Sequence, residues 1–258
     1  DLTVTGVQTC ALPISMEKYA IESSMAKVYC SELNGRVIDS GLQMMGGYGF
    51  IEEYTMARLY RDCRIDRIWE GTNEINRQII TGYMMKKALM EELPIQSAIR
   101  EIEQYMNNGK LETDSEILLA ESNVVETSKR LALYLLNEGI CEFGQDLKHQ
   151  QQITDILANI FIDIYVAEST VLRAKKMLEN PTSPPSVEGV AKIFVAEMAQ
   201  RMVQLAETAL KGIYNGDLSP LMHESLNAFR SRMYLPTNTI GLKREIAAYA
   251  YSKTSYPY

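Results

Sequence analysis

Apolar residues recur every three or four positions along most of the chain, and this spacing predicts amphipathic helices. The expected helices cover residues 16–45, 55–63, 72–93, 95–107, 115–138 and 149–179, then, beyond a break at 180–185, a long helix to about Tyr214 and shorter ones over 221–232 and 238–250. No segment alternates apolar and polar residues for long enough to predict a strand. The pattern therefore predicts an all-α protein.

The apolar positions of the longer helices form stripes that would face a core. They are Ala20, Met25, Val28, Leu33, Val37 and Leu42 in the first helix, and Leu118, Val125, Leu131, Leu135, Ile153, Ile156, Leu157, Ile160, Ile164, Leu172, Val190, Phe194, Met198, Met202, Leu205, Ala209 and Ile213 in the later ones. Pro94 ends the first group of helices. We expect one helical bundle over residues 16–93 and a second, antiparallel bundle over residues 94–258.

A glycine-rich turn follows the first helix, where Gly46, Gly47 and Gly49 let the backbone leave the helical path. Such a turn can offer backbone N–H groups to a phosphate. It can also be a simple glycine stop at a helix C-terminus, which is the commoner use. No strand precedes the turn and the G-x-G-x-x-G spacing is absent, so a dinucleotide-binding βαβ unit is not indicated.

The densest run of charged side chains covers residues 61–77. Within it, Glu70 follows Trp69 and precedes a Gly71-Thr72 turn, where Thr72 is placed to cap the next helix. A carboxylate beside a tryptophan at such a turn can occupy a poorly solvated pocket, where it becomes a stronger base. The plainer alternative is a surface glutamate that complements the positive end of the helix.

Composition and charge exclude several classes of protein. The net charge is −7 and there is no long basic run, which argues against a nucleic-acid partner. The four cysteines have neither zinc-ligand nor disulfide-framework spacing, and the two histidines are far apart, so no metal site is expected. No apolar stretch is long enough to span a membrane. We expect a soluble, cytoplasmic protein.

Residues 1–15 follow neither a helical nor a signal-peptide pattern. Residues 4–14 match the translation of a common sequencing adapter, so we expect an assembly artefact that is unstructured and poorly packed. The natural sequence would then begin near Ser15 or Met16, and its upstream part would be missing.

Three motifs between residues 16 and 90 carry a family resemblance. They are Gln43-Met44-Met45-Gly46-Gly47, then Arg61-Asp62, then Ile68-Trp69-Glu70-Gly71-Thr72-Asn73-Glu74-Ile75. Their order, spacing and residue types resemble the C-terminal helical domain of acyl-CoA dehydrogenases. This resemblance implies a bacterial flavoprotein enzyme that uses FAD.

The resemblance also implies a set of site residues. Glu70 would be the catalytic base, and Trp69 and Gly71 would flank the acyl thioester. The residues that would contact FAD are Gln43, Met44, Met45, Gly46 and Gly47, which serve the neighbouring subunit, and Thr72, Asn73 and Glu74 after the base.

The implied reaction makes the α,β-double bond of a fatty acyl-CoA, as in fatty-acid β-oxidation. Glu70 would remove the α-proton while a hydride leaves the β-carbon for the flavin. The backbone N–H of Glu70 would help to hold the thioester oxygen as negative charge builds on it. An electron-transfer flavoprotein would then accept the electrons.

The second bundle is similar in length and helical pattern to the C-terminal extension of long- and very-long-chain members of the family. That similarity implies a homodimer and, as in some members, peripheral membrane contact. Because the family's N-terminal helical domain and middle β-domain are absent, this chain alone should bind FAD weakly or not at all and be inactive. The alternative is a catalytically silent helical module for assembly or membrane docking, which would need neither the E-G-T nor the Q-x-x-G-G motif.

Overall fold

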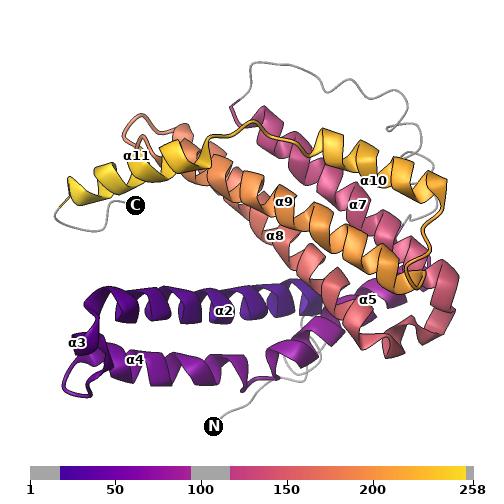
Figure 1. Cartoon of the computed structure of the whole chain (residues 1–258), viewed down its shortest axis with the longest axis horizontal. Coiled ribbons are helices and arrows are strands. Elements are labelled where there is room, and N and C mark those ends of the chain that lie inside the picture. The colour runs from indigo at the N-terminus through magenta and orange to yellow at the C-terminus, as the bar shows by residue number, and fades with distance from the viewer. Residues whose placement is uncertain (1–17, 94–116, 254–258) are drawn as a thin grey trace, which may run out of the picture. The chain divides into compact units, whose positions relative to one another are not determined.

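The structure is a computed structural model that describes residues 18–93 and 117–253 (Figure 1). All regular secondary structure in these two ranges is helical, which confirms the all-α prediction. The helix expected over residues 95–107 and the N-terminal segment 1–15 lie outside the described residues. The chain divides into two compact units, residues 1–87 and 88–258.

The first unit is a helical hairpin followed by a further helix. α2 (Ala20–Met45) runs to the glycine turn, the single turn α3 (Gly47–Phe50) reverses the chain, and α4 (Thr55–Arg64) returns along α2 (Figure 1). The short 3₁₀ helix η1 (Ile65–Arg67) then leads to α5 (Asn73–Leu89), which ends four residues before the expected Leu93. The hairpin places the start of α5 beside the first half of α2.

The apolar stripe of α2 faces a core only in its first half. Met25 and Val28 are buried, as expected, whereas Leu33 and Val37 are 38% and 60% exposed. The expected burial of these two side chains is wrong, because the shorter α4 covers one side of α2 and leaves the rest of the stripe open.

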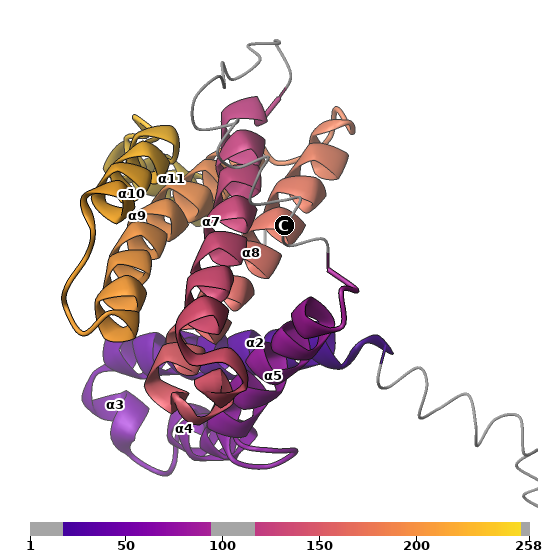
Figure 2. The same ribbon diagram turned by 90° about the vertical axis from the view of Figure 1, so that its right-hand side faces the viewer.

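The second unit is a bundle around three long helices. α7 (Leu119–Phe143), α8 (Gln151–Leu178) and α9 (Val187–Ile213) pack against one another, and the 3₁₀ helix η2 (Gly144–His149) joins α7 to α8 (Figure 2). α10 (Pro220–Arg232) packs against α7 and α9, and α11 (Thr239–Tyr251) packs against α9. Each of the last two begins with a side-chain cap, from Ser219 and Asn238.

Most of the expected stripe residues form the core of this bundle. Fully buried members include Leu131, Leu135, Leu157, Ile160, Met198 and Met202. Leu172 and Val190 are 60% and 40% exposed, so their assignment to the core is wrong. In α8, Val171 is buried instead, because it lies seven residues, or almost two full turns, after Ile164.

Candidate functional site

The candidate base, Glu70, lies on a turn with unusual backbone geometry. After η1, Glu70 and Gly71 both adopt left-handed conformations, with φ of +55° and +77°. Glycine reaches this region freely, whereas a residue with a Cβ loses about 1–2 kcal/mol there. Contacts around the turn must therefore hold Glu70 in this conformation.

The turn is open to solvent. Glu70 is exposed and Trp69 keeps 56% of its surface accessible. The expected poorly solvated pocket is therefore wrong for this chain, because no described side chain covers the carboxylate. Among the described residues, the Glu70 carboxylate has no hydrogen bond or ion pair, and its backbone N–H has no acceptor. Both groups are free to meet a ligand.

A hydrogen-bond network, exposed at Gly71 and buried around Asn73, ties this turn to α2. Lys27 Nζ donates to the carbonyl oxygen of Gly71 and to Asn73 Oδ1, both at 2.7 Å. Asn73 Nδ2 donates to Ser31 Oγ at 3.0 Å. Asn73 is 2% exposed, so its side chain points into the molecule and is not open to a cofactor.

An ion pair extends the network into α5. Arg77 and Glu32 pair at 2.6 Å with side chains only 12% and 28% exposed, and Asn73 Nδ2 also donates to Glu32 at 3.2 Å. The start of α5 is thus fastened to the middle of α2 by charged and neutral hydrogen bonds. Charge-assisted hydrogen bonds of this kind are stronger than neutral ones.

The residues after the base fix the start of α5. Asn76 Nδ2 donates to the carbonyl oxygens of Gly71 and Thr72, at 2.8 and 3.1 Å. Thr72 Oγ1 accepts the backbone N–H of Ile75 at 3.3 Å, which confirms its role as a cap. A hydrogen bond from its own backbone N–H, and then one from the Thr72 hydroxyl, lower the pKa of the exposed Glu74.

Sequence reasoning missed the residues that hold the turn. They are Lys27, Ser31, Glu32, Asn76 and Arg77. One signal was present, since Lys27 and Ser31 stand four residues apart and so share a face of α2 beside the apolar stripe. Their partner Asn73 is more than 40 residues away in sequence, and only the hairpin brings it to them.

The glycine turn lies on the surface at the end of α2. The Gly46 N–H donates to the carbonyl of Gln43 at 3.2 Å, and Gly46 has φ +58°, so the turn is a helix stop. All five residues assigned to it are exposed, Met44 at 83%. A Cβ added at Gly46 or Gly47 would meet nothing within 4 Å, so a ligand can approach the backbone there.

A groove of about 450 Å³ lies beside the glycine turn. Its lining combines aromatic and basic side chains and consists of Leu42, Phe50, Glu52, Ala57, Tyr60, Arg61 and Arg64. Arg61 pairs with Glu52 at 3.0 Å, both exposed. Aromatic walls with two guanidinium groups fit a ligand that carries both rings and phosphates.

The glycine turn and the Glu70 turn lie far apart within the unit. Gln43 follows Lys27 by 16 residues on α2, which at about 1.5 Å per residue separates them by about 24 Å. Figure 1 shows the glycine turn at one end of the hairpin and the start of α5 towards the other. The structure does not bring the two predicted sets of cofactor residues together in one chain.

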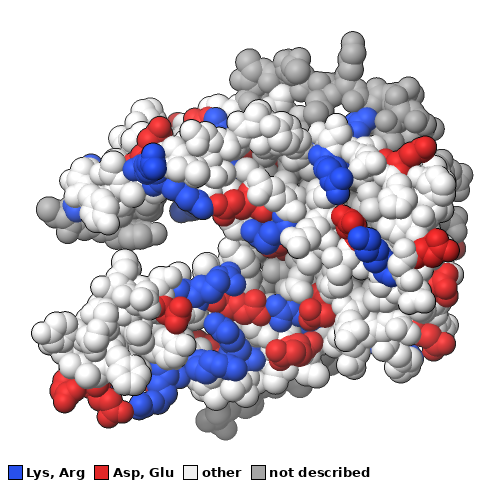
Figure 3. Space-filling model, viewed as in Figure 1, with Lys and Arg blue, Asp and Glu red and all other residues white. Residues whose placement is uncertain are grey.

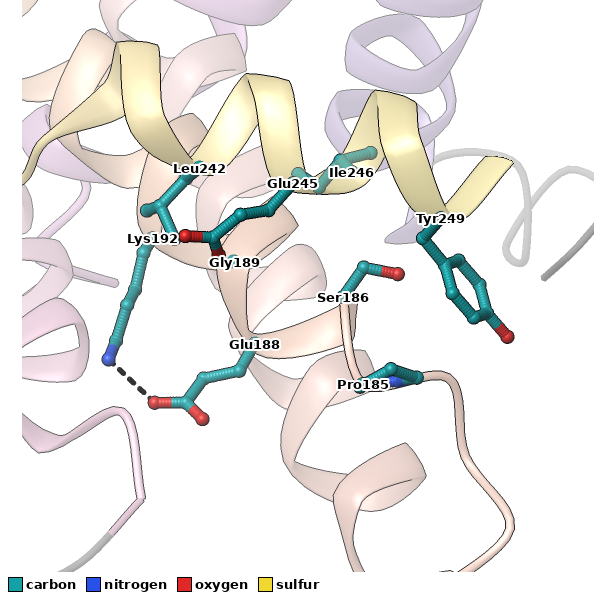
Figure 4. Close-up of a pocket in the computed structure, with 9 residues that line it drawn as sticks. All are labelled: Pro185, Ser186, Glu188, Gly189, Lys192, Leu242, Glu245, Ile246 and Tyr249. Atoms are coloured by element: carbon teal, nitrogen blue, oxygen red, sulfur yellow. Dashed lines mark ion pairs between the residues drawn. The ribbon is translucent and has the colours of Figure 1, made fainter. Parts of the chain in front are cut away.

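The second unit offers a smaller cavity of about 270 Å³ between α9 and α11 (Figure 4). A Glu188–Lys192 ion pair of 2.6 Å lies in its wall.

Among the described residues, no group of His, Cys, Asp and Glu could hold a metal ion, and His149 and His223 are exposed. None of the described helices is long and apolar enough to cross a membrane. Positive and negative side chains are interspersed over the face seen in Figure 3.

Two family models match the chain, both described as "Acyl-CoA dehydrogenase, C-terminal domain", over residues 7–85 and 127–227. A "Probable acyl-CoA dehydrogenase" of Bacillus subtilis is 35% identical over 245 residues, which cover 94% of this chain and 41% of that protein. The chain belongs to the acyl-CoA dehydrogenase family. The expected family resemblance is thereby confirmed, and the first match includes both the glycine turn and the Glu70 turn.

Two further proteins are similar to this chain. The crystal structure of the Bacillus anthracis acyl-CoA dehydrogenase complexed with FAD has a TM-score of 0.85 and 31% identity, over 95% of this chain and 41% of that one. The caffeyl-CoA reductase-Etf complex subunit CarC of Acetobacterium woodii is 46% identical over 66 residues, 26% of this chain and 17% of that protein. The chain spans about two fifths of the length of the Bacillus proteins.

Proposed function

We propose that this chain is the base-bearing C-terminal part of an FAD-dependent acyl-CoA dehydrogenase that makes the α,β-double bond of a fatty acyl-CoA in β-oxidation. One observation carries the proposal: the exposed carboxylate of Glu70, which has no partner among the described residues, stands on a left-handed turn that a hydrogen-bond network holds. A general base must be held in a fixed position and must be free to accept a proton, and a carboxylate without a partner on a rigid backbone meets both conditions.

The residues of the chain supply proton removal and charge stabilisation. Glu70 takes the α-proton of the thioester, and its free backbone N–H donates to the thioester oxygen as negative charge grows there. Trp69 and Gly71 flank the acyl group. FAD, when bound, supplies the acceptor for the hydride that leaves the β-carbon. The products are an enoyl-CoA and the two-electron-reduced cofactor, with the proton on Glu70.

The surface of the first unit supports the cofactor assignment. The exposed Gly46–Gly47 backbone and the groove with Arg61 and Arg64 fit the phosphates and rings of FAD. The bound FAD of the Bacillus anthracis relative agrees with this choice. Of the residues assigned after the base, Glu74 is exposed and Thr72 is partly exposed, so a cofactor could reach their side chains, whereas the buried Asn73 would contact FAD through its backbone.

The separation of about 24 Å between the two turns supports a homodimer, in which each subunit lends its glycine turn to the partner's cofactor. Large apolar side chains are exposed on the first unit, among them Phe50 at 76% and Tyr48 at 64%, and their exposure also favours a surface that the partner subunit covers in the dimer.

The second unit is similar to the C-terminal extension of a long-chain member of the family. An electron-transfer flavoprotein (Etf) as acceptor agrees with the Acetobacterium relative, which is a subunit of a reductase–Etf complex. The cytoplasm, with peripheral membrane contact, is the proposed location.

The test is Glu70→Gln in the full-length gene product. Loss of a general base is worth about 10²–10⁴-fold in rate. We expect acyl-CoA-dependent dye reduction to fall by at least about 10²-fold while the flavin absorbance of the purified protein is unchanged. Glu91→Gln is the matched control, because Glu91 is also exposed and left-handed, with φ +59°. Activity of Glu70→Gln close to that of Glu91→Gln would instead favour the catalytically silent assembly or docking module.

A further inference from the structure

The carbonyl oxygen of Gly71 is the fixed point of the turn that carries Glu70. It accepts two hydrogen bonds, from Lys27 Nζ at 2.7 Å and from Asn76 Nδ2 at 2.8 Å. A carbonyl oxygen has two acceptor positions, and both are used here. The two donors come from different helices, α2 and α5, so the Gly71–Thr72 peptide is held from two directions.

The Lys27 donor is itself held in place. Its second hydrogen bond goes to Asn73 Oδ1 at 2.7 Å, and Asn73 is buried against Ser31 and Glu32. The Glu32 carboxylate is in turn paired with Arg77 at 2.6 Å. A lysine that was free to move could not fix a backbone carbonyl, but one that is also hydrogen-bonded to the buried Asn73 can.

The Glu70 carboxylate itself makes no hydrogen bond to the network around Gly71. Glu70 has no hydrogen-bond partner among the described residues, so within that part of the chain its position is set by the backbone on which it stands. Its φ of +55° is one that a glutamate rarely adopts unaided. Release of the Gly71 carbonyl would let the turn relax and move the carboxylate away from the α-carbon.

We propose that Lys27 is a positioning residue for the reaction, which holds the Gly71 carbonyl and thereby aims Glu70 at the substrate α-proton. Asn76 is the second hydrogen-bond donor to the Gly71 carbonyl. This role rests on the proposed function of Glu70. Both hydrogen bonds of Lys27 go to this chain, to Gly71 and Asn73, so it would act through the backbone of the turn.

The experiment replaces Lys27 in the full-length enzyme with Met, which is one atom shorter, has a similar helix propensity and lacks the donor. A displacement of about 1 Å at a reacting group costs about 10²-fold in rate. We expect kcat to fall about 10–100-fold with KM and FAD content little changed. The kinetic isotope effect with α-deuterated substrate should increase, because proton removal becomes slower. Lys27→Arg, which keeps charged donors, should recover part of the rate.

The matched control is Lys129→Met in the second unit. Lys129 also makes two short hydrogen bonds, to Glu126 and Glu168 at 2.7 and 2.6 Å, but lies on α7. Its loss should leave kcat and the isotope effect unchanged. If Lys27→Met does not fold, Asn76→Ala removes the other donor and should give the same signature.

The outcomes separate this inference from the proposed function. Loss of activity in Glu70→Gln together with normal kcat and isotope effect in Lys27→Met overturns the positioning role and keeps the base. Full activity in Glu70→Gln overturns the base, whatever Lys27→Met does. An effect of Lys27→Met on FAD content alone, with a normal isotope effect, shows a structural role and contradicts positioning.

Discussion

At the scale of single residues, the proposed role of Glu70 depends on backbone conformations that side-chain types alone do not reveal. Glu70 and Gly71 are consecutive left-handed residues, and only one of them is a glycine. The sequence identified both residues, and the cap at Thr72 was predicted and confirmed. The strain at Glu70 and the network that supports it come from contacts across more than 40 residues of sequence.

Replacement of Gly71 by Ala tests the conformation of the turn. The φ of +77° disfavours a Cβ by about 1–2 kcal/mol, and that Cβ would lie 3.2 Å from Asn76 Nδ2, which holds the Gly71 carbonyl. We expect the free energy of unfolding to fall by about 1–2 kcal/mol in urea titrations of this chain. Gly82→Ala is the control, since a Cβ there meets nothing within 4 Å. Equal stability of the two variants would contradict the strained turn.

At the scale of elements, the corner between α2 and α3 is set by close packing as well as by a glycine stop. The three glycines of this corner differ in their roles. Gly46 is left-handed, Gly47 stands in open space, and a Cβ at Gly49 would lie 2.6 Å from the carbonyl oxygen of Leu42. The spacing of glycines in the sequence cannot separate these three roles.

The pair Gly49→Ala and Gly47→Ala tests this difference. Overpacking against a backbone carbonyl costs about 1–3 kcal/mol, so Gly49→Ala should lower the free energy of unfolding by about that amount. Gly47→Ala should leave the free energy of unfolding unchanged or raise it slightly, because alanine favours a helix and nothing obstructs its Cβ. Chemical denaturation of both variants gives the comparison, and a similar loss in both would show that close packing is not the cause.

At the scale of the whole molecule, the packing of long helices stabilises the second unit. The second unit buries a continuous apolar core between α7, α8 and α9 and closes it with α10. At that closure, Tyr214 Oη donates to Glu138 at 2.6 Å, and the ring of Tyr134 lies against Phe229 with centroids 6.0 Å apart. Burial, and then the negative charge of Glu138, raise the pKa of Tyr134 to about 12.

The raised pKa of Tyr134 predicts a loss of stability in alkali. The unfolded chain releases this proton near pH 10 and the folded chain near pH 12, so the unfolded state binds fewer protons in between. The stability that Tyr134 contributes is complete below about pH 10 and is lost as the pH rises towards 12. Denaturation from pH 9 to 12 should show a shallower decline for Tyr134→Phe than for the natural chain. Tyr234→Phe, at a residue that is 73% exposed, should follow the natural chain.

The sequence by itself determined the all-α class, most of the described helices and the family, because these depend on local periodicity and on short motifs of contiguous residues. It also placed Glu70 on a capped turn. Only the tertiary structure decided which stripe residues are buried, since Leu33, Val37, Leu172 and Val190 have the right spacing but no neighbour to cover them. It alone joined Lys27 to Gly71 and separated the two turns by about 24 Å, because distances between helices depend on how the chain folds back on itself.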